Sequence, residues 1–239
     1  MKIAIIYGNQ REGSTYHCVK VIKDTFLVYE DVTFTEFFLP RDMPHFCLGC
    51  FNCFLTGEQN CPHYEHVQPI VDALLSSDAI ILSSPTYGFN VTGSMKALID
   101  HLCYMWMSHR PNEKMFSKVA MLVSTTAGLG TGSTLKTMKN TLNFMGVKRI
   151  YSYGVAVAAA SWQEVKPDKK SKIEQALTKK TKKFYQAVKK RDKLSYRLHT
   201  KIFFFIMKRL NSTYNDENFD KKYWQKMGWL EKVKPFSKM

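Results

Sequence analysis

The sequence lacks an apolar run long enough to cross a membrane. Its longest strongly apolar stretches, residues 155–160 and 202–207, fall far short of the roughly 18 residues that a spanning helix needs. Polar residues from Gly8 onward leave no room for the apolar core of a signal peptide. Low-complexity segments are also absent. We therefore expect a globular, cytoplasmic protein and not an integral membrane, exported or fibrous one.

Acidic residues are scarce in the last third of the chain. Residues 1–165 carry 13 basic and 13 acidic residues, whereas residues 166–239 carry 22 and 7, so this last part holds the whole formal charge of +15. Nucleic-acid binding needs a reading element besides basic charge, and we identify none. We expect solvated helix faces or an anion-facing surface, and no nucleic-acid partner.

Apolar, β-prone runs alternate with helical periodicities, the pattern of βαβ units and a parallel sheet. The middle helices show apolar stripes at i, i+3, i+4 spacing. Gly146 fits the end of the third of them, and Ser133 or Thr134 fits its N-cap. The predicted strands are Lys2–Tyr7, Val32–Phe38, Ala79–Ser83, Val119–Ser124 and Ile150–Val157.

The spacing of apolar residues in the basic part of the chain predicts helices. We predict that a first apolar helix face completes the core of a domain of residues 1–192. We predict that residues 193–239 form a helical C-terminal arm. The first face consists of Ile173, Leu177, Phe184 and Val188, and a second face, on the arm, consists of Leu198, Ile202, Ile206 and Leu210. We predict an α/β fold with a doubly wound five-stranded parallel sheet in the order 2-1-3-4-5 and a basic C-terminal helical extension.

In such a sheet, ligands bind beyond the carboxyl ends of the strands, here between strands 1 and 3. The first loop there ends in Gly13-Ser14-Thr15 at a helix start, where N–H groups and the helix dipole suit a phosphate, although an ordinary Ser N-cap fits as well. The second loop presents Tyr87 as a wall for a planar ring, and the third contains three glycines. We expect a phosphate-bearing heterocycle at this edge.

Four of the six cysteines lie close together in the chain, and a reducing compartment argues against disulfides. Their C-x2-C-x2-C-x7-C spacing, Cys47, Cys50, Cys53 and Cys61, can ligate a [4Fe–4S] cluster. We prefer free thiols, and zinc held by some of these thiols with His63 is a weaker option because the paired-ligand pattern is absent. Cys18 and Cys103 fit buried apolar positions, whereas the sequence names no partner for His101 or His109.

Residues 1–160 resemble the NADPH-dependent FMN reductases and iron-sulfur flavoproteins of the flavodoxin-like fold. The resemblance rests on residues 8–15, the cysteine segment 47–53, Ser84-Pro85-Thr86-Tyr87 and residues 93–100. It implies an FMN site in which the first loop holds the phosphate, the second lines the ribityl chain and ring, and the third faces the pyrimidine. The implied cofactor-binding residues are Gly8, Asn9, Arg11, Ser14, Thr15, Pro85, Thr86, Tyr87, Gly88, Phe89, Asn90, Thr125, Thr126, Ala127 and Gly128.

The resemblance implies an oxidoreductase that passes a hydride from NADPH or NADH through flavin N5 to a small-molecule or protein acceptor, such as a quinone, a flavin or a similar compound. No catalytic acid or base is required, because the flavin carries the chemistry. The resemblance also implies a homodimer whose second subunit helps to wall the flavin. The alternatives are a flavodoxin-like or iron-sulfur electron carrier without nicotinamide activity, and a redox-sensing or interaction module that uses the basic arm. For the arm we favour a dimer contact or a lid over the flavin to binding at a membrane surface.

Overall fold

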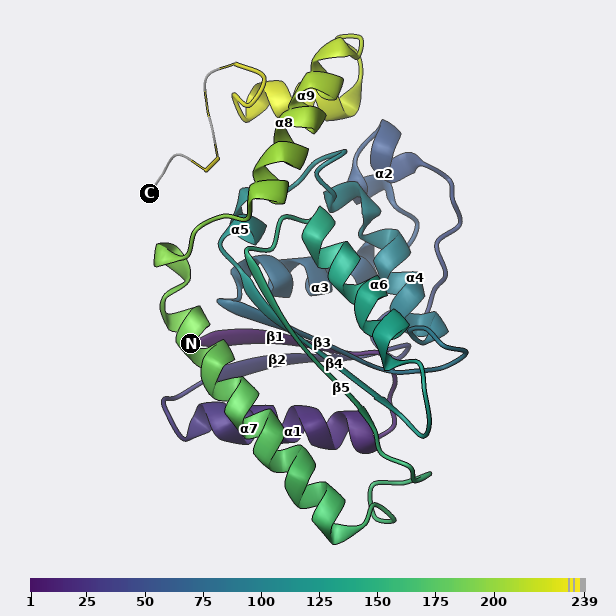
Figure 1. Ribbon diagram of the computed structural model, residues 1–239. Coiled ribbons are helices and arrows are strands. Elements are labelled where there is room, and N and C mark those ends of the chain that lie inside the picture. Colours follow the sequence, from purple (N-terminus) through teal and green to yellow (C-terminus); the bar gives the residue numbers. More distant parts are fainter. Residues whose placement is uncertain (232, 234, 237–239) are drawn as a thin grey trace.

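One parallel sheet organises the chain in a computed structural model that describes residues 1–231, 233, 235 and 236 (Figure 1). Its strand order, β2-β1-β3-β4-β5, and the parallel pairing confirm the predicted sheet. β3 and β4 each extend two residues beyond their predicted ends. The strands are β1 (Lys2–Tyr7), β2 (Thr33–Phe38), β3 (Ala79–Pro85), β4 (Val119–Thr126) and β5 (Arg149–Ala156).

Helices cover both faces of the sheet (Figure 1). One face carries α1 (Ser14–Leu27) and α7 (Pro167–Lys189), and the other carries α3 (Tyr64–Ser76), α4 (Gly93–His101) and α6 (Thr131–Phe144). None of the helices among the described residues is long and apolar enough to span a bilayer. Short helical segments lie in the connections: α2 (Asn52–Leu55), η1 (Glu58–Asn60), η2 (Cys103–Met105), α5 (Glu113–Phe116) and η3 (Arg191–Lys193).

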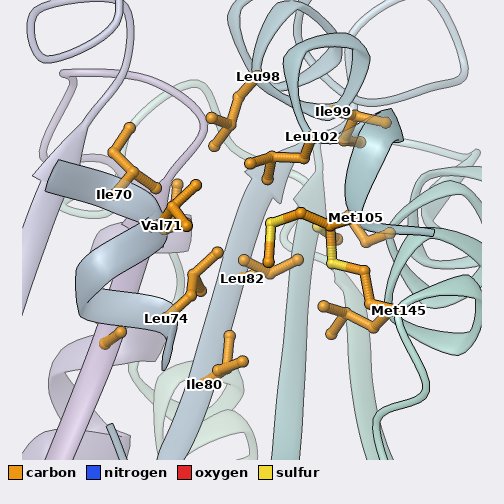
Figure 2. Packing of buried hydrophobic residues seen from close by; sticks show 14 of the residues in the cluster. Ile70, Val71, Leu74, Ile80, Leu82, Leu98, Ile99, Leu102, Met105 and Met145 are labelled. Carbon is orange, nitrogen blue, oxygen red and sulfur yellow. The ribbon is translucent and has the colours of Figure 1, made fainter. Parts of the chain in front are cut away.

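The core has two layers because successive side chains of a strand point to opposite faces. On β1, Ile6 joins the layer beneath α3, α4 and α6, whereas Ile5 joins the layer beneath α1 and α7. Figure 2 shows the first layer, in which Leu82 of β3 lies among side chains such as Leu74 and Leu102. Burial on both faces explains why the strands read as continuous apolar runs.

The start of α6 differs from the prediction. The helix begins at Thr131 with Gly130 as its N-cap, so the prediction of Ser133 or Thr134 at the N-cap is wrong. Both hydroxyls have other partners: Ser133 donates to the carbonyl oxygen of Phe89, and the Thr134 hydroxyl lies 2.9 Å from that of Thr86. The predicted end is confirmed, since Gly146 follows the helix with a φ of +86°.

Two helices of the arm, α8 (Leu198–Thr213) and α9 (Phe219–Lys226), pack beside α5, which leads into the amino end of β4 (Figure 1). One face of α8 is buried through Phe204, while Ile202 and Phe205 on its other face are exposed. The face carrying Phe204 therefore packs, but the face opposite it has no cover within the described residues. Phe204 shares a small core with Met107, Phe116, Trp224 and Trp229.

Candidate functional site

The carboxyl ends of β1, β3 and β4 meet in a cleft of about 340 Å³, within the range of small-molecule sites. Ser14 and Tyr87, from the loops after β1 and β3, lie on the same cleft. The structure therefore brings the predicted loops together. The predicted residues that line the cleft are Asn9, Arg11, Ser14, Thr15, Pro85, Thr86, Tyr87, Thr125, Thr126 and Ala127.

The first turn of α1 presents backbone donors to this cleft. Its N-cap is Gly13, which has no capping side chain, and no acidic residue occupies the first turn. The alternative of an ordinary Ser N-cap is therefore not what the structure shows, because Ser14 is the first helical residue. N–H groups at the positive end of a helix bind anions. The turn fits a phosphate.

The loop after β3 folds into a tight hairpin. Tyr87 and Asn90 exchange two backbone hydrogen bonds of 2.9 and 3.0 Å across Gly88 and Phe89, which both have positive φ values. Tyr87 is 54% exposed and accepts a hydrogen bond of 3.4 Å from Asn9 Nδ2. The hairpin thus holds an aromatic ring at the cleft, clear of the core.

The loop after β4 is tied to both other loops. The Thr86 N–H donates to the Thr125 carbonyl oxygen at 2.9 Å, and the Thr125 hydroxyl bonds that of Thr15. Gly130 has a φ of +102°, and a Cβ there would lie 3.0 Å from Phe89 and Thr86. A glycine is therefore required for the close approach of this loop to the hairpin.

Five predicted residues do not line the cleft: Gly8, Gly88, Phe89, Asn90 and Gly128. Two of them build its frame. The Gly8 N–H donates to the Ser83 carbonyl oxygen at 2.7 Å and its carbonyl accepts from the Thr92 hydroxyl, while Asn90 Oδ1 accepts from the Thr137 hydroxyl at 2.7 Å. Their role in the structure is to position the loops.

The segment after β5 contributes lining residues that the sequence analysis missed. They are Val157, Ala159 and Ala160. Gly13 of the first loop, which the sequence analysis placed at the helix start, also lines the cleft. Arg11 Nη2 donates to the Ala160 carbonyl oxygen at 2.8 Å, and His17 stacks on Trp162 with ring centroids 5.2 Å apart. These contacts fasten the segment to the start of α1. Small and apolar lining residues carry no chemical pattern that a sequence search could use.

The cysteine segment forms a second, smaller cavity of about 60 Å³ at the carboxyl end of α4. Cys47 and Cys50 are exposed, whereas Cys53 and Cys61 are half-buried. Burial, and then the neighbouring Cys61, raise the pKa of the Cys53 thiol to about 11. All four predicted cysteines line this one cavity. Cys18 is buried as predicted, but Cys103 is half-buried and its thiol faces the Ile99 carbonyl oxygen at 3.4 Å.

His101 and His109, for which the sequence names no partner, each have one in the structure. His101 Nε2 lies 2.9 Å from His63 Nδ1, beside the cysteine cavity, and His109 Nδ1 lies 2.8 Å from Asp220 Oδ2 on α9. Arg110 also pairs with Asp220 and donates to the Cys53 carbonyl oxygen. Sequence reasoning missed these pairs because they join segments that lie 38 and 111 residues apart.

A larger hollow of about 440 Å³ lies between η1, α3 and α9. Arg110 in its lining is already paired with Asp220 and Glu58. The hollow includes no residue from the carboxyl end of a strand, where ligands of such sheets bind. The arm likewise contributes no residue to the 340 Å³ cleft, so within the described chain it is not the lid that the sequence suggested.

Comparisons with known proteins agree with this geometry. The family model of NADPH-dependent FMN reductases matches residues 1–161. An iron-sulfur flavoprotein of Clostridioides difficile (strain 630) is 36% identical over 105 residues, which cover 42% of this chain and 45% of that protein. An FMN-dependent NADH:quinone oxidoreductase of Burkholderia pseudomallei (strain K96243) is 26% identical over 61% of this chain and 73% of its own length.

The fold also matches a solved structure, the flavoenzyme NAD(P)H:(acceptor) oxidoreductase FerB from Paracoccus denitrificans. The TM-score is 0.54 at 18% identity, and the match covers 80% of this chain and 98% of that one. At this identity the likeness establishes the flavodoxin-like fold alone. The match of the family model to two thirds of the chain goes further: the chain belongs to the NADPH-dependent FMN reductase family.

Proposed function

We propose that this protein binds FMN in the cleft at the carboxyl edge of the sheet and passes electrons from NADPH or NADH to a quinone, a flavin or a similar acceptor. One observation carries the proposal. The loops after β1, β3 and β4 converge on a helix start whose backbone N–H groups have no capping side chain. Such a site binds a phosphate and, beside it, an aromatic ring system.

Different residues of the cleft contact different parts of the cofactor in this proposal. The first turn of α1, with Ser14 and Thr15, binds the phosphate, and Tyr87 flanks the ring. The Arg11 guanidinium adds positive charge near the phosphate while its bond to the Ala160 carbonyl oxygen holds the cleft together. Backbone groups of Thr125, Thr126 and Ala127, which line the cleft, recognise the polar edge of the heterocycle in this proposal.

Bound FMN would supply the redox chemistry, because its N5 accepts a hydride and its reduced form returns two electrons to an acceptor. The protein orients the ring and limits access to one face. The family match supports the nicotinamide donor, and the Burkholderia relative acts on a quinone by its name. No side chain of the cleft has to act as an acid or a base.

A second copy of the chain completes the cleft in this proposal. Three large apolar side chains stand exposed beside it: Tyr87 at 54%, Phe89 at 69% and Leu129 at 81%. Exposed apolar patches at a site mark contact surfaces. Light scattering should give a dimer mass, and Leu129→Asp should lower it to that of a monomer.

An electron carrier without nicotinamide activity is the competing function. In it, the four thiols around the small cavity would hold a [4Fe–4S] cluster that exchanges single electrons with the flavin. The donor set is present, since four cysteines line one cavity, although His63 and His101 line it too. Four iron and four sulfide atoms per chain in anaerobically purified protein would favour the carrier.

Anaerobic reduction separates the two functions. We expect NADPH or NADH, added to the FMN-loaded protein, to bleach the flavin absorption within the time of mixing. Dithionite serves as the positive control, because it reduces either kind of flavoprotein. Bleaching by dithionite but by neither nicotinamide would contradict the reductase and leave the carrier.

A further inference from the structure

Two histidines turn the cysteine cavity into a mixed nitrogen and sulfur site. Cys61 Sγ, one nitrogen of His63 and one of His101 all lie within 4.8 Å of one another. They come from the segment before α3 and from the last residue of α4, which the fold brings together over 38 residues. The site is separate from the flavin cleft, with which it shares no lining residue.

The orientation of His101 is fixed by its surroundings. His101 is only 5% exposed, and its Nδ1 lies 2.8 Å from the Ala97 carbonyl oxygen. A carbonyl oxygen only accepts hydrogen bonds, so Nδ1 carries the proton and Nε2 keeps a lone pair directed at His63. A backbone carbonyl bonded to the far nitrogen is the usual support of a metal-binding histidine.

The spacing of the two nitrogen atoms suits a tetrahedral ion. His63 Nδ1 and His101 Nε2 are 2.9 Å apart. With Zn–N bonds near 2.0–2.1 Å, tetrahedral ligand atoms lie about 3.3 Å apart. The two nitrogens would therefore have to separate by a few tenths of an ångström, and Cys61 Sγ, within 4.8 Å of both, would have to approach to the zinc–sulfur distance. His45, stacked on His63 with ring centroids 4.5 Å apart, limits how that ring can turn.

The charge of the surroundings also favours a cation. His101 is the last residue of α4, where the carbonyl end of the helix dipole carries partial negative charge. Cys47, Cys50 and Cys53 line the same cavity as further sulfur donors, and so does Asp100, whose carboxylate is paired with Lys96. The volume of about 60 Å³ accommodates a single ion and one small ligand.

We propose that Cys61, His63 and His101 bind one zinc ion, with a fourth ligand from a neighbouring thiol of the cysteine segment. Two imidazoles and two thiolates in a tetrahedral arrangement are typical of structural zinc sites, whereas a [4Fe–4S] cluster takes thiolates alone in its common form. On binding, each cysteine ligand releases its thiol proton to solvent, and the proton of His63 moves from Nδ1 to Nε2. The ion ties the cysteine segment to α4.

Cobalt(II) is the probe of this site, because zinc is spectroscopically silent. We expect tag-free protein to bind one cobalt ion per chain with the intense visible bands of a tetrahedral, thiolate-ligated complex, and zinc to displace it. His63→Gln and Cys61→Ser should each weaken cobalt binding at least tenfold. The matched control is His66→Gln, since His66 lies close to His45 but outside the cavity, and it should bind cobalt like the parent.

Several results would overturn the proposal. One is protein that takes up no cobalt at micromolar concentrations. Another is cobalt binding that survives both His63→Gln and Cys61→Ser. A third is protein that carries four iron and four sulfide atoms per chain, unchanged in the His63→Gln variant. FMN binding should be the same in all these variants, so failure here leaves the proposed flavin function standing.

Discussion

The hydroxyl oxygens of Thr15 and Thr125 lie 2.6 Å apart in the lining of the cleft at the carboxyl edge of the sheet. Thr15 belongs to the first turn of α1, and Thr125 lies near the end of β4, 110 residues further along the chain. Their hydrogen bond fixes the distance between the first loop and the third. Loops that are distant in sequence can therefore bind a phosphate and a heterocycle at the same time.

Ser14→Asp should strongly weaken FMN binding. A carboxylate at this position would occupy the phosphate site, bond the free N–H groups of the first turn and repel the phosphate dianion. We expect FMN affinity to fall by roughly a hundredfold or more, as the loss of several charge-assisted hydrogen bonds implies. Quenching of flavin fluorescence measures it.

Riboflavin is the control ligand for this variant, because it has no phosphate. Its affinity should change much less than that of FMN. An equal loss for both flavins would mean that Ser14→Asp disturbs the cleft as a whole, which would contradict the assignment of the first turn to the phosphate.

Phe89→Asn should stabilise the protein. Within a single chain, Phe89 has a φ of +61° and is 69% exposed, so it stores strain without burying its ring. Asparagine tolerates this conformation, and we expect the free energy of unfolding to rise by roughly 0.5–1 kcal/mol. Denaturant titration measures it, at a protein concentration at which the chain is monomeric. Leu129→Asn, which also removes an exposed apolar side chain, is the control, and an equal gain there would rule out strain relief as the cause.

Asp220→Ala should strongly destabilise the docking of the arm. The Asp220 carboxylate is buried between Arg110 and His109, and its removal leaves the Arg110 guanidinium, 4% exposed, without its main partner. Breaking a buried pair in this way costs about 3–5 kcal/mol. Lys222→Ala removes the exposed pair with Glu217 and should cost under about 1 kcal/mol. Similar losses in the two variants would contradict this account of the arm.

Alkaline pH should loosen α9. The Tyr223 hydroxyl donates to the Pro111 carbonyl oxygen at 2.7 Å, and burial, then Glu113, raise its pKa to about 12. An unfolded tyrosine titrates near pH 10. The raised value stabilises the fold fully below about pH 10, and this contribution, on the order of 2 kcal/mol, is lost as the pH rises toward about 12.

Tyr223→Phe isolates this effect, because other tyrosines also titrate in the alkaline range. The free energy of unfolding of the parent should fall more steeply than that of the variant between pH 10 and 12. Parallel pH profiles would show that Tyr223 does not contribute.

The sequence was sufficient to predict the sheet, its strand order and most of the cleft. Continuous apolar strands and the turn-forming loops after them carry a local pattern, and Ser14 and Tyr87 meet as that pattern predicted. The N-cap of α6 was missed because Ser133 bonds Phe89, a contact set by tertiary structure. The predicted division of the chain at residue 192 stays a prediction.

The contacts between distant segments could not be read from the sequence. His101 has no local pattern that links it to His63, and Asp220 has none that links it to Arg110. Ala159 and Ala160 line the cleft through small side chains and backbone, which leave no chemical trace in a single sequence. The apolar face predicted for the arm, which consists of Leu198, Ile202, Ile206 and Leu210, is exposed, and α8 packs through Phe204 instead.

Equilibrium titration of FMN with the purified apoprotein tests the central claim most directly. We predict saturable quenching of the flavin fluorescence with one FMN per chain, and an affinity for riboflavin that is lower by roughly tenfold or more because the phosphate contacts are missing. The absence of saturable quenching, or equal affinity for the two flavins, would contradict the claim that the first turn of α1 binds the phosphate of FMN.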